Sequence, residues 1–89
     1  PDGVPAYALS PADAEAGVPL VTILAAVGVE SKAQARRLIE QGGVVLNDQR
    51  LSAADVRRVI TLADLRDFDG VKAAVIRMGK GKAAKVVLE

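Results

Sequence analysis

The chain has 89 residues, and its 12 Lys and Arg against 11 Asp and Glu give a formal net charge of +1. This length allows one domain with a thin core, which must be aliphatic because the chain has one Phe, one Tyr and no Trp. The absence of Cys and His excludes disulfides, thiolate nucleophiles and cysteine-ligated metals, and it removes the commonest general base and metal ligand. Carboxylate chemistry stays open in principle, but the acids are scattered along the chain.

The charges are unevenly distributed along the chain. Residues 1–30 carry a formal charge of −4, residues 31–50 carry +2, residues 51–70 carry −1 and residues 71–89 carry +4. The nearly neutral total therefore conceals two basic segments. A local positive field of this kind attracts a polyanion even when the net charge does not.

The start of the sequence shows neither a secretion signal nor a membrane anchor. The N-terminal residues are acidic, and the longest apolar run, over residues 20–29, is too short to span a bilayer. The chain opens on a proline with no initiator Met, which suggests a segment cut from a longer protein. We therefore expect a cytoplasmic protein with no membrane partner.

The N-terminal part is predicted to form a linker and a short helix over residues 1–17, followed by the domain proper over residues 18–89. Two prolines and a glycine near the start disfavour a helix, although residues 4–9 could dock on the domain as a short strand. Ser10 can cap the short helix, which ends at Gly17.

Two helices with apolar faces are predicted next. The first is a helix of about nine residues within the segment 18–28, which starts with a proline, ends with a glycine and is apolar nearly all round. The second begins after Ser31, which can form a reciprocal capping box with Gln34, and it ends at the glycine pair 42–43. The two-residue link between the helices makes them meet at an angle. The residues expected to pack between them are Leu20, Ile23, Leu24, Val27, Ala35, Leu38 and Ile39.

The remaining segments favour strands. Residues 44–46 begin a hairpin that turns at an Asn-Asp pair, and residues 71–78 and 83–88 form a second hairpin around a Gly-Lys-Gly-Lys turn. An Asp-Phe-Asp-Gly turn precedes the second hairpin. Residues 56–61 fit either a short helix or a strand, with a strand at residues 59–60 favoured.

Three cations lie on the second helix away from its apolar side. Lys32 and Arg36 are one helical turn apart, with Cβ atoms about 5–6 Å from each other, and Arg37 broadens the patch. That spacing is comparable to the distance between successive phosphates, and a guanidinium can bridge two phosphate oxygens. The alternative is a solvated helix face with an ordinary Arg36–Glu40 pair.

A second basic cluster is predicted at the C-terminal turn. Lys80 and Lys82 alternate with glycines, and Lys72, Arg77 and Lys85 are near them in the sequence. Glycines let the backbone approach a phosphate closely, although an ordinary hairpin turn with solubilising lysines fits equally well. Because the chain has only two aromatic residues, any RNA binding should be to backbone and shape.

Asn47 follows an apolar strand and has two interpretations. An amide at this place most simply supports its own turn. Because the turn adjoins the basic helix, the amide could instead contact a ribose or a phosphate, and the sequence leaves both roles open.

The stretch from Ser31 to Arg50 resembles the signature of the alpha-L RNA-binding family, the S-four-type domain named after a small-subunit ribosomal protein. The flanking residues 5–7, 17–28 and 78–82 make it most similar to the C-terminal domain of bacterial tyrosyl-tRNA synthetases. The resemblance implies an α+β fold in which two packed helices lie against a small, mostly antiparallel sheet and bind structured RNA.

By the same resemblance, the expected function is a tRNA-binding appendage. It would contact the RNA backbone in the anticodon stem and the long variable arm. An upstream catalytic domain, which binds ATP, would carry out aminoacylation, and the full-length protein would be a homodimer. When the RNA-contacting positions of the family are transferred to this sequence, the expected RNA contacts are Lys32, Arg36, Arg37 and Asn47, with Lys80 and Lys82 as supporting candidates. These residues lack the catalytic fold, so we expect no enzyme activity, catalytic residue, metal or cofactor in this segment.

Two alternatives remain at this point. The first is an rRNA-binding member of the same family, for example the appendage of a pseudouridine synthase. The second is a protein-interaction or dimerisation module, in which the apolar segment 20–29 would be exposed instead of forming the core.

Overall fold

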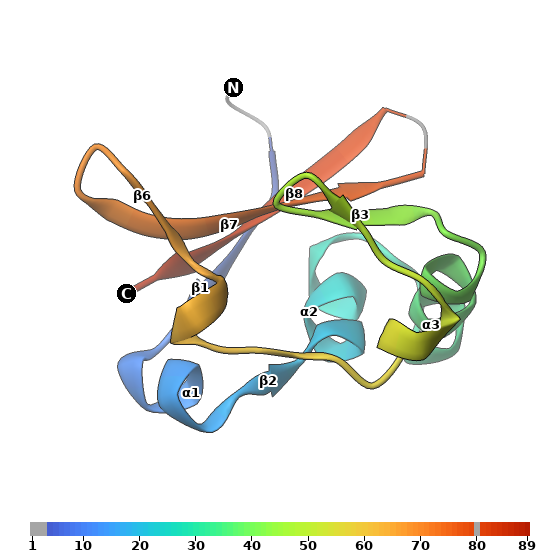
Figure 1. Ribbon diagram of the computed structural model, residues 1–89, viewed down its shortest axis with the longest axis horizontal. Helices are drawn as coiled ribbons and strands as arrows, with labels where there is room; N and C mark the ends of the chain where they lie inside the picture. Colours follow the sequence, from blue (N-terminus) through green and yellow to red (C-terminus); the bar gives the residue numbers. More distant parts are fainter. Residues whose placement is uncertain (1–3, 80) are drawn as a thin grey trace.

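A sheet and a layer of helices on one side of it make up the molecule, in a computed structural model that describes residues 4–79 and 81–89 (Figure 1). The three helices are α1 (Pro11–Ala16), α2 (Leu20–Val27) and α3 (Lys32–Glu40). The strands are β1 (Ala6–Leu9), β2 (Val18–Pro19), β3 (Val44–Leu46), β4 (Gln49–Arg50), β5 (Val59–Ile60), β6 (Arg66–Phe68), β7 (Val71–Met78) and β8 (Lys82–Leu88). The predicted α+β fold, with helices packed against a mostly antiparallel sheet, is confirmed.

The main sheet has the strand order β1-β8-β7-β3-β4, and β6 also pairs with β7. Only β1 runs parallel to its neighbour, β8, whereas the other paired strands of the described chain are antiparallel. The short strand expected over residues 4–9 is therefore present as β1, and its Leu9 is fully buried. The boundary between linker and domain at residue 17 stays a prediction. Strands β2 and β5 form a separate two-stranded ladder.

Helix α3 has well-defined ends. The Ser31 hydroxyl accepts a hydrogen bond from the Gln34 amide at 3.2 Å, which is one of the two bonds of the predicted capping box. At the other end, the Gly42 amide donates to the Ile39 carbonyl and the Gly43 amide donates to the Leu38 carbonyl. This pairing is a Schellman motif, and Gly42 supplies its left-handed residue with φ +76°.

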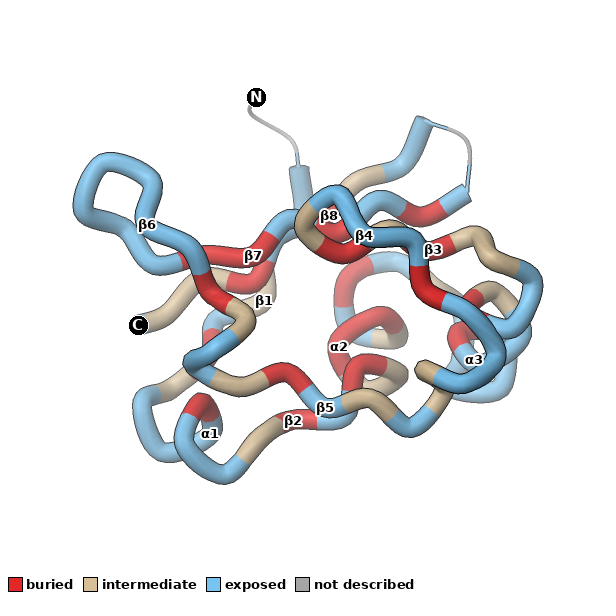
Figure 2. The backbone as a smooth tube through the Cα atoms, viewed as in Figure 1, coloured by how far each residue is buried: buried red, intermediate tan, exposed pale blue. Residues whose placement is uncertain are grey.

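The core lies between the helix pair and the sheet (Figure 2). Six of the seven residues expected between the helices are buried, and Leu38 is partly buried against the same core. The packing of α2 on α3 is therefore as predicted. Because no polar side chain is buried among the described residues, burial of apolar surface is what holds the two layers together.

The segment between the hairpins contains short elements. The favoured strand at residues 59–60 is present as β5. The 3₁₀ turns η1 (Ala53–Asp55) and η2 (Leu62–Asp64) flank it, each started by a capping box. The turn expected over residues 67–70 is shorter than predicted, because Arg66–Phe68 pair with β7 as strand β6 and only residues 69–70 turn, both with positive φ.

Candidate nucleic-acid interface

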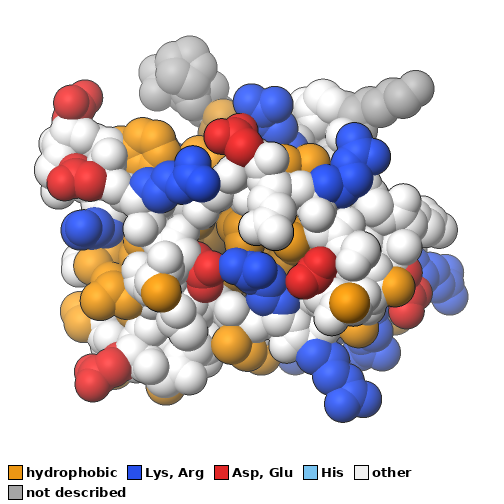
Figure 3. Space-filling view, viewed as in Figure 1, with side chains coloured by type: hydrophobic (Ala, Val, Ile, Leu, Met, Phe, Trp, Pro, Cys, Tyr) orange, Lys and Arg blue, Asp and Glu red, His pale blue; other side chains and the backbone are white. Residues whose placement is uncertain are grey.

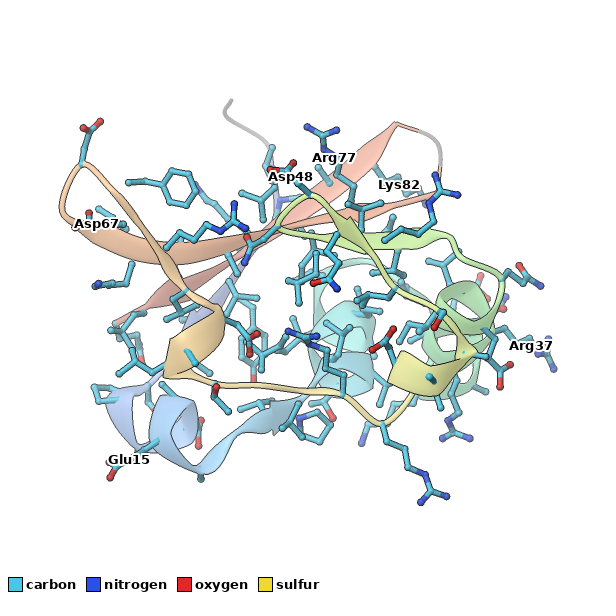
Figure 4. All side chains as sticks on the ribbon, viewed as in Figure 1. Glu15, Arg37, Asp48, Asp67, Arg77 and Lys82 are labelled. Atoms are coloured by element: carbon cyan, nitrogen blue, oxygen red, sulfur yellow. The ribbon has the colours of Figure 1, made fainter. Side chains whose placement is uncertain are left out.

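The three cations of α3 are exposed, and Arg37 lies on the side of the helix away from the core. Ala35 and Ile39, on the opposite side, have no exposed surface, so the helix cannot rotate without uncovering them. Lys32, Arg36 and Arg37 are all exposed. Arg37 projects outward from the molecule (Figure 4), and Lys and Arg side chains gather over the region of α3 at the lower right (Figure 3).

These cations have no acidic partner in the described residues. The ion pairs found there join Arg58 to Asp64 and Arg66 to Asp48. The Arg36–Glu40 pair that a plain solvated helix face would form is not among them. The charges of the α3 cations are therefore available to an external anion.

Arg57 adds a further cation beside Arg36 of α3. The sequence alone did not identify it as a candidate. It lines a shallow depression together with Arg36 and Val56. Its neighbour Arg58 is instead partly buried in the ion pair with Asp64. The Arg-Arg pair in the sequence was a signal, but only the fold decides which of the two side chains faces solvent.

The C-terminal turn is hydrogen-bonded to the end of α3. The Gly79 amide donates to the Gly43 carbonyl at 2.8 Å. A groove beside this contact is lined by Gln34 and Leu38 of α3 and by Lys82 of β8, which is exposed. Lys80 lies outside the described residues.

The first predicted basic cluster thus lies on α3 itself, and Lys82 of the second lies beside the same helix. Arg36 faces the depression on one flank, and Lys82 borders the groove on the other. Arg37 lies about 100° around the helix from Arg36, on the side opposite the buried residues. Positive charge therefore borders α3 on both flanks and on its outer side.

Asn47 is engaged inside the protein. Its side-chain amide donates to the Asp64 carbonyl at 2.7 Å, and its side-chain oxygen accepts from the Val75 amide at 3.0 Å. The Arg66 guanidinium donates to the backbone carbonyl of Asn47 at 3.1 Å. These bonds join the β3–β4 turn to η2 and β7, which favours the turn-supporting interpretation of this residue over a direct RNA contact.

Replacing Asn47 by Ala is therefore expected to lower the free energy of unfolding by about 1–2 kcal/mol. The substitution leaves two backbone groups without their partners and places Ala at φ +48°, which favours Asn. Urea denaturation measures the change, with the exposed Gln49→Ala as a control expected to stay within about 0.5 kcal/mol. Unchanged stability with weaker RNA binding would instead assign the amide to the RNA.

Neither a metal site nor a membrane-crossing helix is found in the described part of the chain. No group of three or more acidic, His or Cys side chains is placed there to hold a metal ion. Its helices are all too short to cross a bilayer.

Comparisons with known proteins agree with this architecture. Over 86 residues, 96% of this chain and 18% of the relative, the chain is 38% identical to a tyrosine–tRNA ligase of Caulobacter vibrioides. It is also 38% identical over 82 residues to the tyrosine–tRNA ligase of Mesorhizobium japonicum, covering 91% of this chain and 18% of the relative. The chain spans about a fifth of the length of these curated relatives. Residues 18–56 match the S4 domain.

Proposed function

We propose that this chain is the tRNA-binding appendage of a tyrosine–tRNA ligase. The observation that carries the proposal is the α3 surface, where Lys32, Arg36 and Arg37 are exposed, lack acidic partners and stand on a helix fixed by its cap and its buried face. The similarity to tyrosine–tRNA ligases over nearly the whole chain supports tRNA as the ligand.

The proposed binding mode is contact with the RNA backbone. Lys82 extends the α3 surface on one side and Arg57 on the other. Phe68 is the exposed aromatic among the described residues, and it lies on β6, outside the residues that line the groove and the depression beside α3. Base stacking would therefore contribute little, and shape and phosphate positions would determine the choice of RNA.

In the complete protein, this segment would position tRNA for a catalytic domain that precedes it. The anticodon stem and the long variable arm are the proposed contacts, and a cytoplasmic homodimer is the proposed assembly. The catalytic step and its ATP would belong entirely to the preceding domain, so the segment would add affinity and orientation and no chemistry of its own.

A titration of this chain with tRNA carrying a long variable arm tests the proposal. With about five phosphates neutralised, the logarithm of the association constant should fall against the logarithm of salt concentration with a slope of about −4 or steeper. A tRNA with a short variable arm should bind more weakly. Binding that does not depend on salt would contradict the proposal, and tighter binding to rRNA fragments would instead favour the rRNA-directed alternative.

The alternative of a protein-interaction module loses its basis in the structure. It required the apolar segment 20–29 to be exposed, whereas Leu20, Ile23 and Leu24 have no exposed surface and belong to the core. We do not propose that function.

A further inference from the structure

The sheet has an outer face that the helices do not cover. Along β7, Ala74, Ile76 and Met78 point into the core, whereas Val75 and Arg77 are exposed on the other side. Figure 1 shows all three helices on the core side of the sheet, and Figure 4 shows Arg77 on the side away from them. The outer face is therefore exposed at Arg50, Val75, Arg77 and Lys85, whereas Ala73, on the same side of β7, is buried.

Strand register brings three cations together on this face. Val45 of β3 lies opposite Arg50 on one neighbouring strand and opposite Arg77 on the other. Directly opposed residues point to the same face, so the two arginines are separated by two strand spacings, about 10 Å. Lys85 is a diagonal neighbour of Arg77 across β7 and β8, at about 7–8 Å. The three cations form a track across the sheet.

The track contains no acid. Its intervening side chains are Val45, Val75 and Ala83, which carry no charge. Arg50, Arg77 and Lys85 are exposed and take part in neither of the ion pairs found in the described chain. Asp48, at the near turn, is 3.7 Å from the Arg66 guanidinium. Mutual repulsion among the three cations is therefore not relieved within these residues, and an external polyanion would relieve it.

The track is continuous with the α3 surface. Gly42 lies two residues after the end of α3, and the Cδ atom of Arg50 is 3.8 Å from the position that a Cβ would take at Gly42. The side chain of Arg50 thus runs from β4 toward the turn that follows α3. Arg37 lies in the last turn of the same helix.

We propose that Arg50, Arg77 and Lys85 form a second phosphate-binding track, which carries the RNA backbone from α3 onto the outer face of the sheet. This inference rests on the proposed function and adds to it: a bound RNA would contact two faces of the domain that meet at the end of α3. The chemistry favours a phosphodiester backbone because the track offers isolated cations on an aliphatic floor, with neither an acid nor an aromatic among the track residues and their intervening neighbours.

The test is the double substitution R50Q/K85Q, with Lys72→Gln as the matched control. Lys72 is an exposed cation of the same strand as Arg77, at a position whose side chain points to the opposite face, and it lies opposite Asp67 in the register of β6 and β7. The double substitution should reduce the magnitude of the salt slope for long-arm tRNA by about 2 and weaken binding about 10-fold at low salt. The control should leave both unchanged.

The outcomes separate this inference from the proposed function. An unchanged slope in R50Q/K85Q, together with a reduced slope in a variant lacking the α3 arginines, would overturn the track and leave the proposed function standing. If neither variant changes RNA binding, the proposed function itself fails. Circular dichroism of each variant checks the fold, and Arg50→Lys with Lys85→Arg, which keeps both charges, should restore most of the slope if the role is electrostatic. A variant that loses binding while keeping the wild-type slope would also contradict the track.

Discussion

Replacing Arg36 and Arg37 together by Ala is expected to weaken binding of long-arm tRNA by roughly 10- to 100-fold and to reduce the magnitude of the salt slope by about 2. Both guanidinium groups are exposed and unpaired with acids in the described residues, so each can neutralise one phosphate and release its counterion. Fluorescence anisotropy of labelled tRNA at several salt concentrations gives both quantities in one series.

The stability of this double variant should hardly change. Exposed side chains away from caps and cores contribute within about 0.5 kcal/mol, and Ala favours a helix at least as well as Arg. Thermal unfolding should therefore show a midpoint close to that of the unmodified chain. Lys72→Ala is the control for RNA binding, because Lys72 lies in the sheet, remote from α3, and its replacement removes a charge without removing a proposed contact. Equal affinities for the unmodified chain and the α3 variant would rule out α3 as the primary RNA surface.

Replacing Ile39 by Ala is expected to cost about 2–5 kcal/mol of stability, the largest effect on folding among the substitutions considered. Ile39 has no exposed surface and joins α3 to the core behind Arg36. In a domain of this size, 1 kcal/mol moves the unfolding midpoint by about 4–8 °C, so the midpoint should fall by at least about 8 °C. Denaturation in urea measures the loss directly.

Leu38→Ala is the matched comparison for Ile39. Leu38 is adjacent on the same helix but only partly buried, so its truncation should cost less. RNA binding by the Ile39 variant should recover on cooling to temperatures where the variant is folded, because its cations are intact. A loss below about 1 kcal/mol would show that α3 is held mainly by its ends and not by its buried face.

Local chemistry made α3 predictable. Ser31 and the glycine pair at 42–43 act on backbone groups within a few residues of themselves, so the sequence contains everything needed to place the ends of the helix. The apolar spacing of Ala35 and Ile39 likewise determined which side would be buried, and hence that Arg37, on the opposite side, would be exposed.

The role of Asn47 could not be read in the same way. Its side chain has partners 17 and 28 residues further along the chain, at Asp64 and Val75. No local pattern announces such bonds, because they exist only after η2 and β7 have been brought against the β3–β4 turn. Strand β6 escaped prediction for a related reason, since its sequence of Arg, Asp and Phe resembles a turn until β7 supplies a partner.

The sequence alone thus determined the helices, their caps, the aliphatic core and the presence of two basic segments, because these depend on interactions between near neighbours and on apolar periodicity. Only the tertiary structure decided which cations share a surface. Arg50 and Arg77 are aligned through Val45 by strand register, and Lys82 reaches the groove beside α3 because the Gly79 amide is bonded to the Gly43 carbonyl. Such pairings join residues far apart in the chain and depend on the whole sheet being formed.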